Sequence, residues 1–182
     1  MRSLSLLLIC ALAACSATYR DPDVAIAAQR DFQPDRYLGR WYEIARFPVR
    51  FEEGCTATVA AYGAIDAETV SVLNSCRKGA PDGPEESIAG TATLVAPGKL
   101  KVRFAGVPFV AADYWVLWVD ENYQTAVVGV PSGRAGWILA RTPKIDPARR
   151  AKAEAVLVRN GYDPGRLYDV PQANALSDVD LD

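Results

Sequence analysis

Eight short strand-like runs, divided by turn residues, limit this chain to an antiparallel β structure. Most connections between the runs are short and rich in Gly, Pro, Asp and Asn, so consecutive strands are expected to pair antiparallel. Leu100, Val102 and Phe104 alternate with basic residues, which is typical of a strand with one buried face. The predicted strands are residues 41–47, 55–62, 69–76, 88–95, 100–105, 114–119, 123–130 and 136–141.

A single helix is predicted after the strands. Asp146 is a good N-cap, Pro147 suits the first helical position, and Gly161 is expected to end the helix. Together these features predict an all-β fold, an eight-stranded antiparallel up-and-down β-barrel with one C-terminal α-helix packed outside. Closure removes exposed strand edges, and an eight-stranded interior is either filled or holds one small ligand. The helical stripe expected to face the barrel consists of Ala148, Ala151, Ala155 and Val158.

The N-terminal residues have the pattern of an export signal. Arg2 precedes an apolar run at residues 4–12, which is far shorter than the ~20 residues of a membrane-spanning helix and fits a secretory signal peptide. The run ends in Leu-Ala-Ala-Cys at residues 12–15, which resembles the bacterial lipoprotein box. This resemblance implies that residues 1–14 are removed and that Cys15 is lipidated. Because Ser16 follows, it also implies an outer-membrane address, with several acyl chains as a firm anchor.

The remaining chain divides into three parts. Residues 15–34 are predicted to be the lipidated N-terminus and a tether, because Ser, Thr, Asp and Pro are frequent and no period is sustained. Residues 35–171 are predicted to be the barrel with its helix, including a short extra strand within 167–170. Residues 172–182 form an acidic tail that is expected to fray.

The cysteine count favours one disulfide. Cys10 leaves with the signal peptide and Cys15 carries lipid, so Cys55 and Cys76 remain as an even pair in an exported protein. If residues 64–68 form the turn, Cys55 lies directly opposite Cys76 on the neighbouring strand. The alternative is two free buried thiols.

The absence of histidine excludes several function classes. Without it the chain has no Ser-His-Asp or Cys-His nucleophile system, none of the common zinc sites and no haem with a proximal His. The net charge of −2 does not fit a basic nucleic-acid-binding surface. The sequence therefore predicts no catalytic residue, no metal, no cofactor and no nucleic-acid partner.

Three segments carry a resemblance to a known family. Residues 37–47, YLGRWYEIARF, strongly resemble the opening motif of the lipocalins, whose core is Gly-x-Trp. The segment DENY at 120–123 resembles the second motif, and WILARTP at 137–143 resembles the third. The extended first motif and the lipoprotein box together are similar to the bacterial outer-membrane lipocalins of the Blc type, which also resemble apolipoprotein D. The cysteine pair, and Val119 before the second motif, depart from the usual pattern.

The resemblance implies mainly structural roles for the motif residues. Trp41 is expected to lie across the closed base of the barrel, with Arg141 stacked on it as a cation–π pair. Gly39, Asp120 and Tyr123 complete the structural set.

The cavity is predicted from the alternation of side chains along the strands. Arg141 points inward at the base, so Trp137 is expected on the same side near the open mouth. Glu43 shares the parity of Trp41 and must either pair with an arginine or be turned outward by a bulge. Apolar mouth-loop residues such as Phe51 either line an entrance, touch a membrane or partner, or fold back onto the rim. The ligand-cavity candidates are Leu100, Val102, Phe104, Tyr114, Val116, Trp118, Trp137 and Leu139.

These features favour a non-enzymatic lipid-binding role. The resemblance implies a lipocalin at the outer membrane that binds and stores or carries fatty acids or lysophospholipids, held by its lipid anchor and facing the periplasm. The alternative is a non-catalytic structural or interaction lipoprotein with a filled barrel, whose apolar mouth is a homodimer or partner interface. An enzyme that uses a free cavity thiol requires Cys55 and Cys76 to be unpaired.

Overall fold

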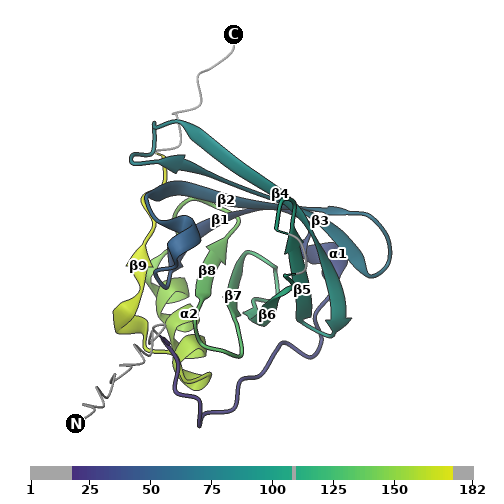
Figure 1. The fold of residues 1–182 in the computed structure, drawn as a ribbon. Coiled ribbons are helices and arrows are strands. Elements are labelled where there is room, and N and C mark those ends of the chain that lie inside the picture. The colour runs from purple at the N-terminus through teal and green to yellow at the C-terminus, as the bar shows by residue number, and fades with distance from the viewer. Residues whose placement is uncertain (1–17, 108–109, 174–182) are drawn as a thin grey trace, which may run out of the picture.

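Eight antiparallel strands close into a barrel in the computed structural model, which describes residues 18–107 and 110–173 (Figure 1). The strands follow one another around the barrel in chain order, and β1 pairs with both β8 and β2, which closes the ring. The predicted signal peptide, Cys15 and the tail beyond residue 173 lie outside the described residues. The strands are β1 Gly39–Arg46, β2 Cys55–Ala64, β3 Thr69–Lys78, β4 Glu85–Ala96, β5 Lys99–Phe104, β6 Ala112–Val119, β7 Thr125–Gly129 and β8 Gly136–Ala140.

One long helix, α2 (Pro147–Arg159), packs outside the barrel against the β7 side (Figure 1). The Asp146 side chain accepts a hydrogen bond from the Arg149 N–H at 2.9 Å, as expected for an N-cap. The predicted packing stripe is wrong, because its alanines and Val158 are exposed. Ala153, Val156 and Leu157 face the barrel instead, and Leu157 gives this face more apolar area than the alanine-rich stripe would bury. The short elements are α1 (Pro34–Tyr37), η1 (Arg50–Glu52), η2 (Pro164–Arg166) and β9 (Tyr168–Asp169), which pairs with β1.

Two apolar clusters hold the fold together. The first fills the lower barrel and includes Trp41, Tyr37 and Phe32. The second lies between the outer face of the barrel and α2 and includes Phe47, Ile138 and others. The strands that contribute to both clusters are apolar on both faces, as β7 shows by being buried along its whole length.

Residues 18–33 do not form the free tether that the sequence predicts. They run along the barrel from α1 to the end where η1 lies, and they are tied to it by backbone hydrogen bonds (Figure 1). The Gln29 N–H donates to the Val116 carbonyl at 2.8 Å, and the Tyr19 N–H donates to the Gly133 carbonyl at 2.7 Å. Arg20 is buried and donates from Nε to the Asn160 carbonyl at 2.8 Å. Backbone hydrogen bonds and the Arg20 side chain therefore hold the segment to the barrel, while most of its polar side chains stay exposed.

The other end of the domain also extends further than predicted. Gln172, the first residue of the predicted tail, donates from Nε2 to the Glu43 carbonyl at 2.6 Å, which holds it against β1. The rest of the predicted tail, from residue 174, lies outside the described residues. Within residues 18–107 and 110–173, none of the helices has the length and apolar character needed to span a membrane.

The predicted register of β2 and β3 is wrong by three residues near the turn. Tyr62 pairs with Val72, where the turn at residues 64–68 would have paired it with Thr69. The Asp66 carboxylate accepts hydrogen bonds from the Glu68 and Thr69 N–H groups at 2.9 and 2.8 Å, and this local cap moves the hairpin centre along the chain. A bulge between residues 56 and 59 changes the register again.

Cys55 and Cys76 nevertheless form the predicted disulfide. Cys55 pairs with Lys78 in the ladder, so Cys76 is its diagonal neighbour on the same face, with 5.4 Å between the Cα atoms. A diagonal pair at this distance is within the range for a disulfide. The bond ties the mouth end of β2 to β3.

We expect the double variant Cys55→Ala, Cys76→Ala to lose about 3 kcal/mol of unfolding free energy, because the closed loop no longer restricts the unfolded chain. Urea unfolding of the two proteins measures the difference. An unchanged midpoint, or two reactive thiols in the denatured, non-reduced parent, would contradict the disulfide.

Candidate ligand-binding site in the upper barrel

A cavity of about 100 Å³ opens at the end of the barrel where the loops 47–54, 79–84 and 131–135 lie. Its wall is mostly apolar and comes from β1, β2, β3, β5, β6, β8 and η1. The volume is below the ~300 Å³ at which pockets for drug-sized ligands begin, so it suits a slim group rather than a bulky ring. The lining residues are Glu43, Phe51, Glu52, Thr58, Val59, Ala60, Tyr62, Val72, Asn74, Val102, Phe104, Ala112, Asp113, Tyr114, Trp137 and Leu139.

The structure distributes the predicted cavity residues over three places. Leu100 and Val116 lie deeper, in the inner apolar cluster. Trp118 faces outward against α2, where the Lys152 Nζ lies 5.1 Å from its ring centroid, so its assignment to the cavity is wrong. The cavity wall itself contains Val102, Phe104, Tyr114, Trp137 and Leu139.

A β-bulge explains the error at Trp118. Val116 pairs with Val128 and Trp118 pairs with Val127, so Leu117 is one extra residue in β6. Leu117 and Trp118 both turn outward, and Val119 returns to the inside. Strict alternation along β6 fails from this point on.

Tyrosine hydroxyls form the floor of the cavity. The Tyr114 hydroxyl lies 2.9 Å from the hydroxyls of both Tyr37 and Tyr62. Burial raises the pKa of Tyr62 to about 12 and raises the pKa of the other two well above the usual value. The floor is therefore neutral at physiological pH, and its hydroxyls are already paired with one another.

Below this floor, aromatic residues close the barrel. The Arg141 guanidinium lies 3.9 Å from the centroid of the Trp41 ring, and the Trp41 Nε1 donates to the Tyr37 carbonyl at 2.7 Å. Arg141 also donates to the Arg40 carbonyl at 2.8 Å. Gly39 has a φ of +92°, and a Cβ there would lie 3.3 Å from Arg141 Nη1, so this position favours glycine on two grounds.

The second motif shapes the turn at the same end. The Asp120 carboxylate accepts hydrogen bonds from the Asn122 and Gln124 N–H groups at 3.1 and 2.8 Å. This holds Tyr123 in a left-handed conformation, with its hydroxyl accepting from the Gln33 N–H at 2.8 Å. The turn therefore fastens the N-terminal segment across the closed base.

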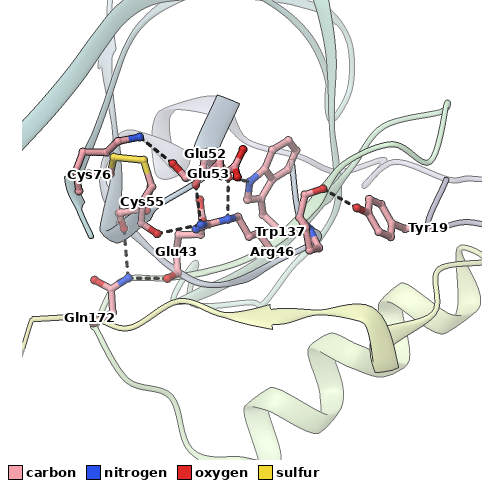
Figure 2. A network of polar contacts seen from close by, with 12 residues as sticks. Tyr19, Glu43, Arg46, Glu52, Glu53, Cys55, Cys76, Trp137 and Gln172 are labelled. Carbon is pink, nitrogen blue, oxygen red and sulfur yellow. Dashed lines mark hydrogen bonds and ion pairs between the residues drawn. A yellow bond between two sulfur atoms is a disulfide. The ribbon is translucent and has the colours of Figure 1, made fainter. Parts of the chain in front are cut away.

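A buried ionic cluster stands on the opposite side, at the mouth (Figure 2). Glu43 points into the barrel and accepts from Arg46 Nη1 at 2.7 Å, while Arg46 Nε lies 3.4 Å from the Glu52 carboxylate. The Glu52 carboxylate also accepts from the Trp137 Nε1 at 3.3 Å. Arg46 donates further to the carbonyls of Glu52 and Cys55, both at 2.9 Å. Arg46 itself does not line the cavity, whereas both of its carboxylate partners do.

A bulge in β1 makes this cluster possible. Residues three apart on a regular strand point to opposite faces, but Ile44 is an extra residue between the pairs Glu43–Leu139 and Ala45–Ile138. The bulge returns Arg46 to the inner face beside Glu43. Of the two alternatives that the sequence left open for Glu43, the pairing with an arginine is confirmed. The bulge lies beyond Glu43 and turns Arg46 inward, so Glu43 itself stays on the inner face.

The cluster has two carboxyl groups for one guanidinium. Burial, together with the neighbouring Glu52 charge, raises the pKa of Glu43 to about 8, against the opposing effect of Arg46. Burial also raises the pKa of Glu52. Two buried carboxylates around one cation carry excess negative charge, so retention of one proton by the pair is favoured near neutral pH.

Two further polar atoms face the cavity region without a partner among the described residues. These are Thr58 Oγ1 and Asn74 Oδ1, both buried, and both residues line the cavity. Buried polar atoms normally have a hydrogen-bond partner, so these two mark places where a ligand or water completes the site. Neither residue was predicted, because the mixed polarity of β2 and β3 resembles an ordinary exposed strand face.

This geometry defines a class of protein: a small ligand-binding β-barrel, sealed at one end by an aromatic and arginine plug and open at the other above an apolar cavity. The chain belongs to the lipocalin family, because the Lipocalin-like domain family matches residues 32–172. Members of this family are generally ligand-binding and non-catalytic proteins.

Sequence relatives support the same placement. The chain is 37% identical over 163 residues to the outer membrane lipoprotein Blc of Escherichia coli K12, covering 87% of this chain and 89% of that protein. It is 38% identical over 150 residues to temperature-induced lipocalin-1 of Arabidopsis thaliana, covering 77% and 79% of the two chains. Rabbit (Oryctolagus cuniculus) apolipoprotein D is 34% identical over 155 residues, 80% of each chain.

Solved structures show the same fold at lower identity. Insecticyanin from the tobacco hornworm Manduca sexta matches with a TM-score of 0.67 and 21% identity, covering 87% of this chain and 92% of that one. Apocrustacyanin C1 matches with a TM-score of 0.65 and 16% identity, over 83% and 91% of the two chains. These two likenesses concern the fold.

The ionic cluster predicts a pH-dependent stability. The folded protein holds a proton on Glu43 up to a pKa of about 8, whereas the unfolded chain releases it near 4.5. The folded state then binds more protons between these values, so the free energy of unfolding falls as the pH rises through this window. We expect Glu43→Gln, which is neutral at every pH, to reduce that fall by something on the order of 2 kcal/mol.

Urea unfolding at several pH values between 5 and 8 measures the slope. Glu121→Gln makes the same chemical change at an exposed position on the closed-end turn and serves as the control. The same slope in the parent and in Glu43→Gln would contradict the proton assigned to the Glu43–Glu52 pair.

Proposed function

We propose that this protein binds one single-chain lipid in the upper barrel and stores or carries it at the bacterial outer membrane. The observation that carries this proposal is the cavity itself, which is apolar, slim and open at one end. Each buried methylene of an alkyl chain contributes ~0.8 kcal/mol, part of which offsets the cost of immobilising the ligand. No step in this function requires a catalytic group.

The polar groups around the cavity favour a lysophospholipid over a free fatty acid. Glu43, Glu52 and Asp113 line the described wall, and no Lys or Arg does. A free carboxylate at the end of the chain would face these acidic groups. A zwitterionic headgroup with an ammonium, or glycerol hydroxyls, offers hydrogen-bond donors to the unpartnered oxygens of Thr58 and Asn74.

Two observations support the proposed location of the protein at the outer membrane, one from its N-terminus and one from its relatives. The Blc relatives are outer membrane lipoproteins by name, and this chain carries Leu-Ala-Ala-Cys at residues 12–15. We therefore assign lipidation to Cys15 and a periplasm-facing position at the outer membrane. Multiple acyl chains on Cys15 supply the anchor, whereas a single chain would bind only marginally.

A filled barrel with a structural or interaction role is the second candidate. The small cavity and the aromatic lower half favour it, because Trp41, Tyr37 and Phe32 occupy the space that a long ligand would need. Lipid binding and a filled barrel make opposite predictions for the tryptophan at the mouth.

We expect binding of a lysophosphatidylethanolamine to change the fluorescence of Trp137, because this ring lines the cavity and is stacked on Tyr114 with 6.3 Å between centroids. Trp137→Phe should remove most of the ligand-dependent change and leave the fold intact. Trp118→Phe is the matched control, since Trp118 lies on the outer face and should keep the full change.

The same titration tests the headgroup. We expect a fatty acid of equal chain length to bind at least several-fold more weakly than the lysophospholipid at pH 8, where its carboxylate is ionised. Equal signals from Trp137→Phe and Trp118→Phe, or no saturable signal with either lipid, would favour the filled barrel.

A further inference from the structure

The first described residues are fastened to the open end of the barrel. The Tyr19 hydroxyl donates to the Pro48 carbonyl at 2.6 Å, in the loop between β1 and β2 (Figure 2). The Tyr19 N–H donates to the Gly133 carbonyl at 2.7 Å, in the loop between β7 and β8. Both loops connect strands at the mouth. The chain therefore joins the barrel at the rim of the cavity rather than at its closed base.

This attachment is reinforced from several sides. The Tyr19 ring stacks on Phe47 with 5.0 Å between the ring centroids. The Arg166 guanidinium also packs on Tyr19, 4.4 Å from its ring centroid. Arg166 also donates to the Thr18 carbonyl at 2.8 Å. Arg20, buried, donates from Nη1 to the Pro131 carbonyl at 3.3 Å. Thr18 is thus a fixed point on the rim.

Very little chain separates this fixed point from the assigned anchor. Only Ser16 and Ala17 lie between Cys15 and Thr18, and an extended chain spans at most ~3.5 Å per residue, so the reach is about 10 Å. The closed end is much further away, because β3 alone has ten residues and a strand rises about 3.3 Å per residue. An anchor at Cys15 therefore keeps the rim close to the bilayer.

The rim carries exposed apolar side chains that suit such a position. Phe51 on η1 is 70% exposed and also lines the cavity. Val107 and Val110, at the end of β5 and before β6, are 44% and 56% exposed. Aromatic and aliphatic side chains in this setting gain by leaving water for the interfacial layer of a membrane.

We propose that the anchored protein stands with its open end on the bilayer, with Phe51 and the neighbouring rim valines in the interfacial layer. The cavity then opens onto the membrane that holds the anchor, and a single-chain lipid exchanges between bilayer and barrel without crossing bulk water. This inference rests on the lipidation of Cys15 given under the proposed function.

The test places a tryptophan at each end of the lipidated, full-length protein, which is reconstituted into phosphatidylcholine vesicles with brominated acyl chains. Phe51→Trp reports on the open end. Ile65→Trp is the matched control, because Ile65 is 55% exposed on the turn between β2 and β3 at the closed end. After subtraction of the parent signal, we expect Phe51→Trp to lose most of its emission and Ile65→Trp to keep it.

Flotation of the same samples with the vesicles tests the anchor separately from the orientation of the barrel. Protein that floats while Ile65→Trp is quenched, or while neither reporter is quenched, overturns the orientation and leaves the anchor in place. Protein that does not float overturns the anchor and the orientation together, while lipid binding is judged independently by the Trp137 titration. A shielded but unquenched Phe51→Trp in a dimeric protein would assign the mouth to a second copy and also overturn the proposal.

A spacer variant tests whether the short linker between Cys15 and Thr18 sets the orientation. Twenty Gly and Ser residues inserted between Ala17 and Thr18 leave the anchor and the rim unchanged but release the barrel from the surface. We expect quenching of Phe51→Trp to fall at least twofold in this variant. Undiminished quenching would contradict the assignment of the orientation to the length of the linker.

Discussion

Strand β1 is the element on which the rest of the structure depends. It hydrogen-bonds to both β2 and β8, so it turns an open sheet into a closed barrel. Its first half carries Trp41, which is fully buried and stacked under Arg141 at the sealed end. Because Arg141 is only partly buried, this cation–π pair is worth about 1 kcal/mol, and neither residue lines the cavity. Its second half carries Glu43 and Arg46, which stand at the open end. A single strand thereby sets which end of the barrel is closed and which accepts a ligand.

The polarity at the mouth has an energetic cost that an all-apolar calyx would avoid. Burying Glu43, Arg46 and Glu52 requires each charge to find a partner, and replacing a buried ion pair by apolar groups is often neutral or stabilising. The cluster therefore contributes little net stability. It places acidic oxygens beside the entrance and fixes the Trp137 ring through its Nε1. This arrangement supports a role in orienting the polar end of a ligand while the alkyl chain packs against the apolar wall.

Much of the fold was predictable because its signals are local. Asp146 and Pro147 mark the start of α2, and the alternation around Val102 marks β5 and its inward face. The errors arise where a single extra residue changes the side of the sheet. Leu117 turns Trp118 outward, and Ile44 turns Arg46 inward. The bulge in β6 leaves no sign because its strand is apolar on both faces near Leu117, and in β1 the parity of Glu43 indicates a bulge without showing that Arg46 is the residue it turns. The prediction of a free tether at residues 18–33 fails for another reason. Arg20 is a polar residue, but it is buried by hydrogen bonds to carbonyls far away in the sequence, which no local pattern reveals.

Native mass spectrometry of the protein extracted from its own membrane measures whether the upper barrel holds one alkyl chain. We expect a single non-covalent adduct per barrel, beyond the covalent anchor, with the mass of a single-chain lipid. Ala112→Trp should abolish this adduct, because Ala112 lines the cavity and is exposed at its entrance, so that an indole there blocks access without disturbing the core. No adduct in the parent, a two-chain lipid, or the same adduct in Ala112→Trp would show that the upper barrel does not hold a single alkyl chain.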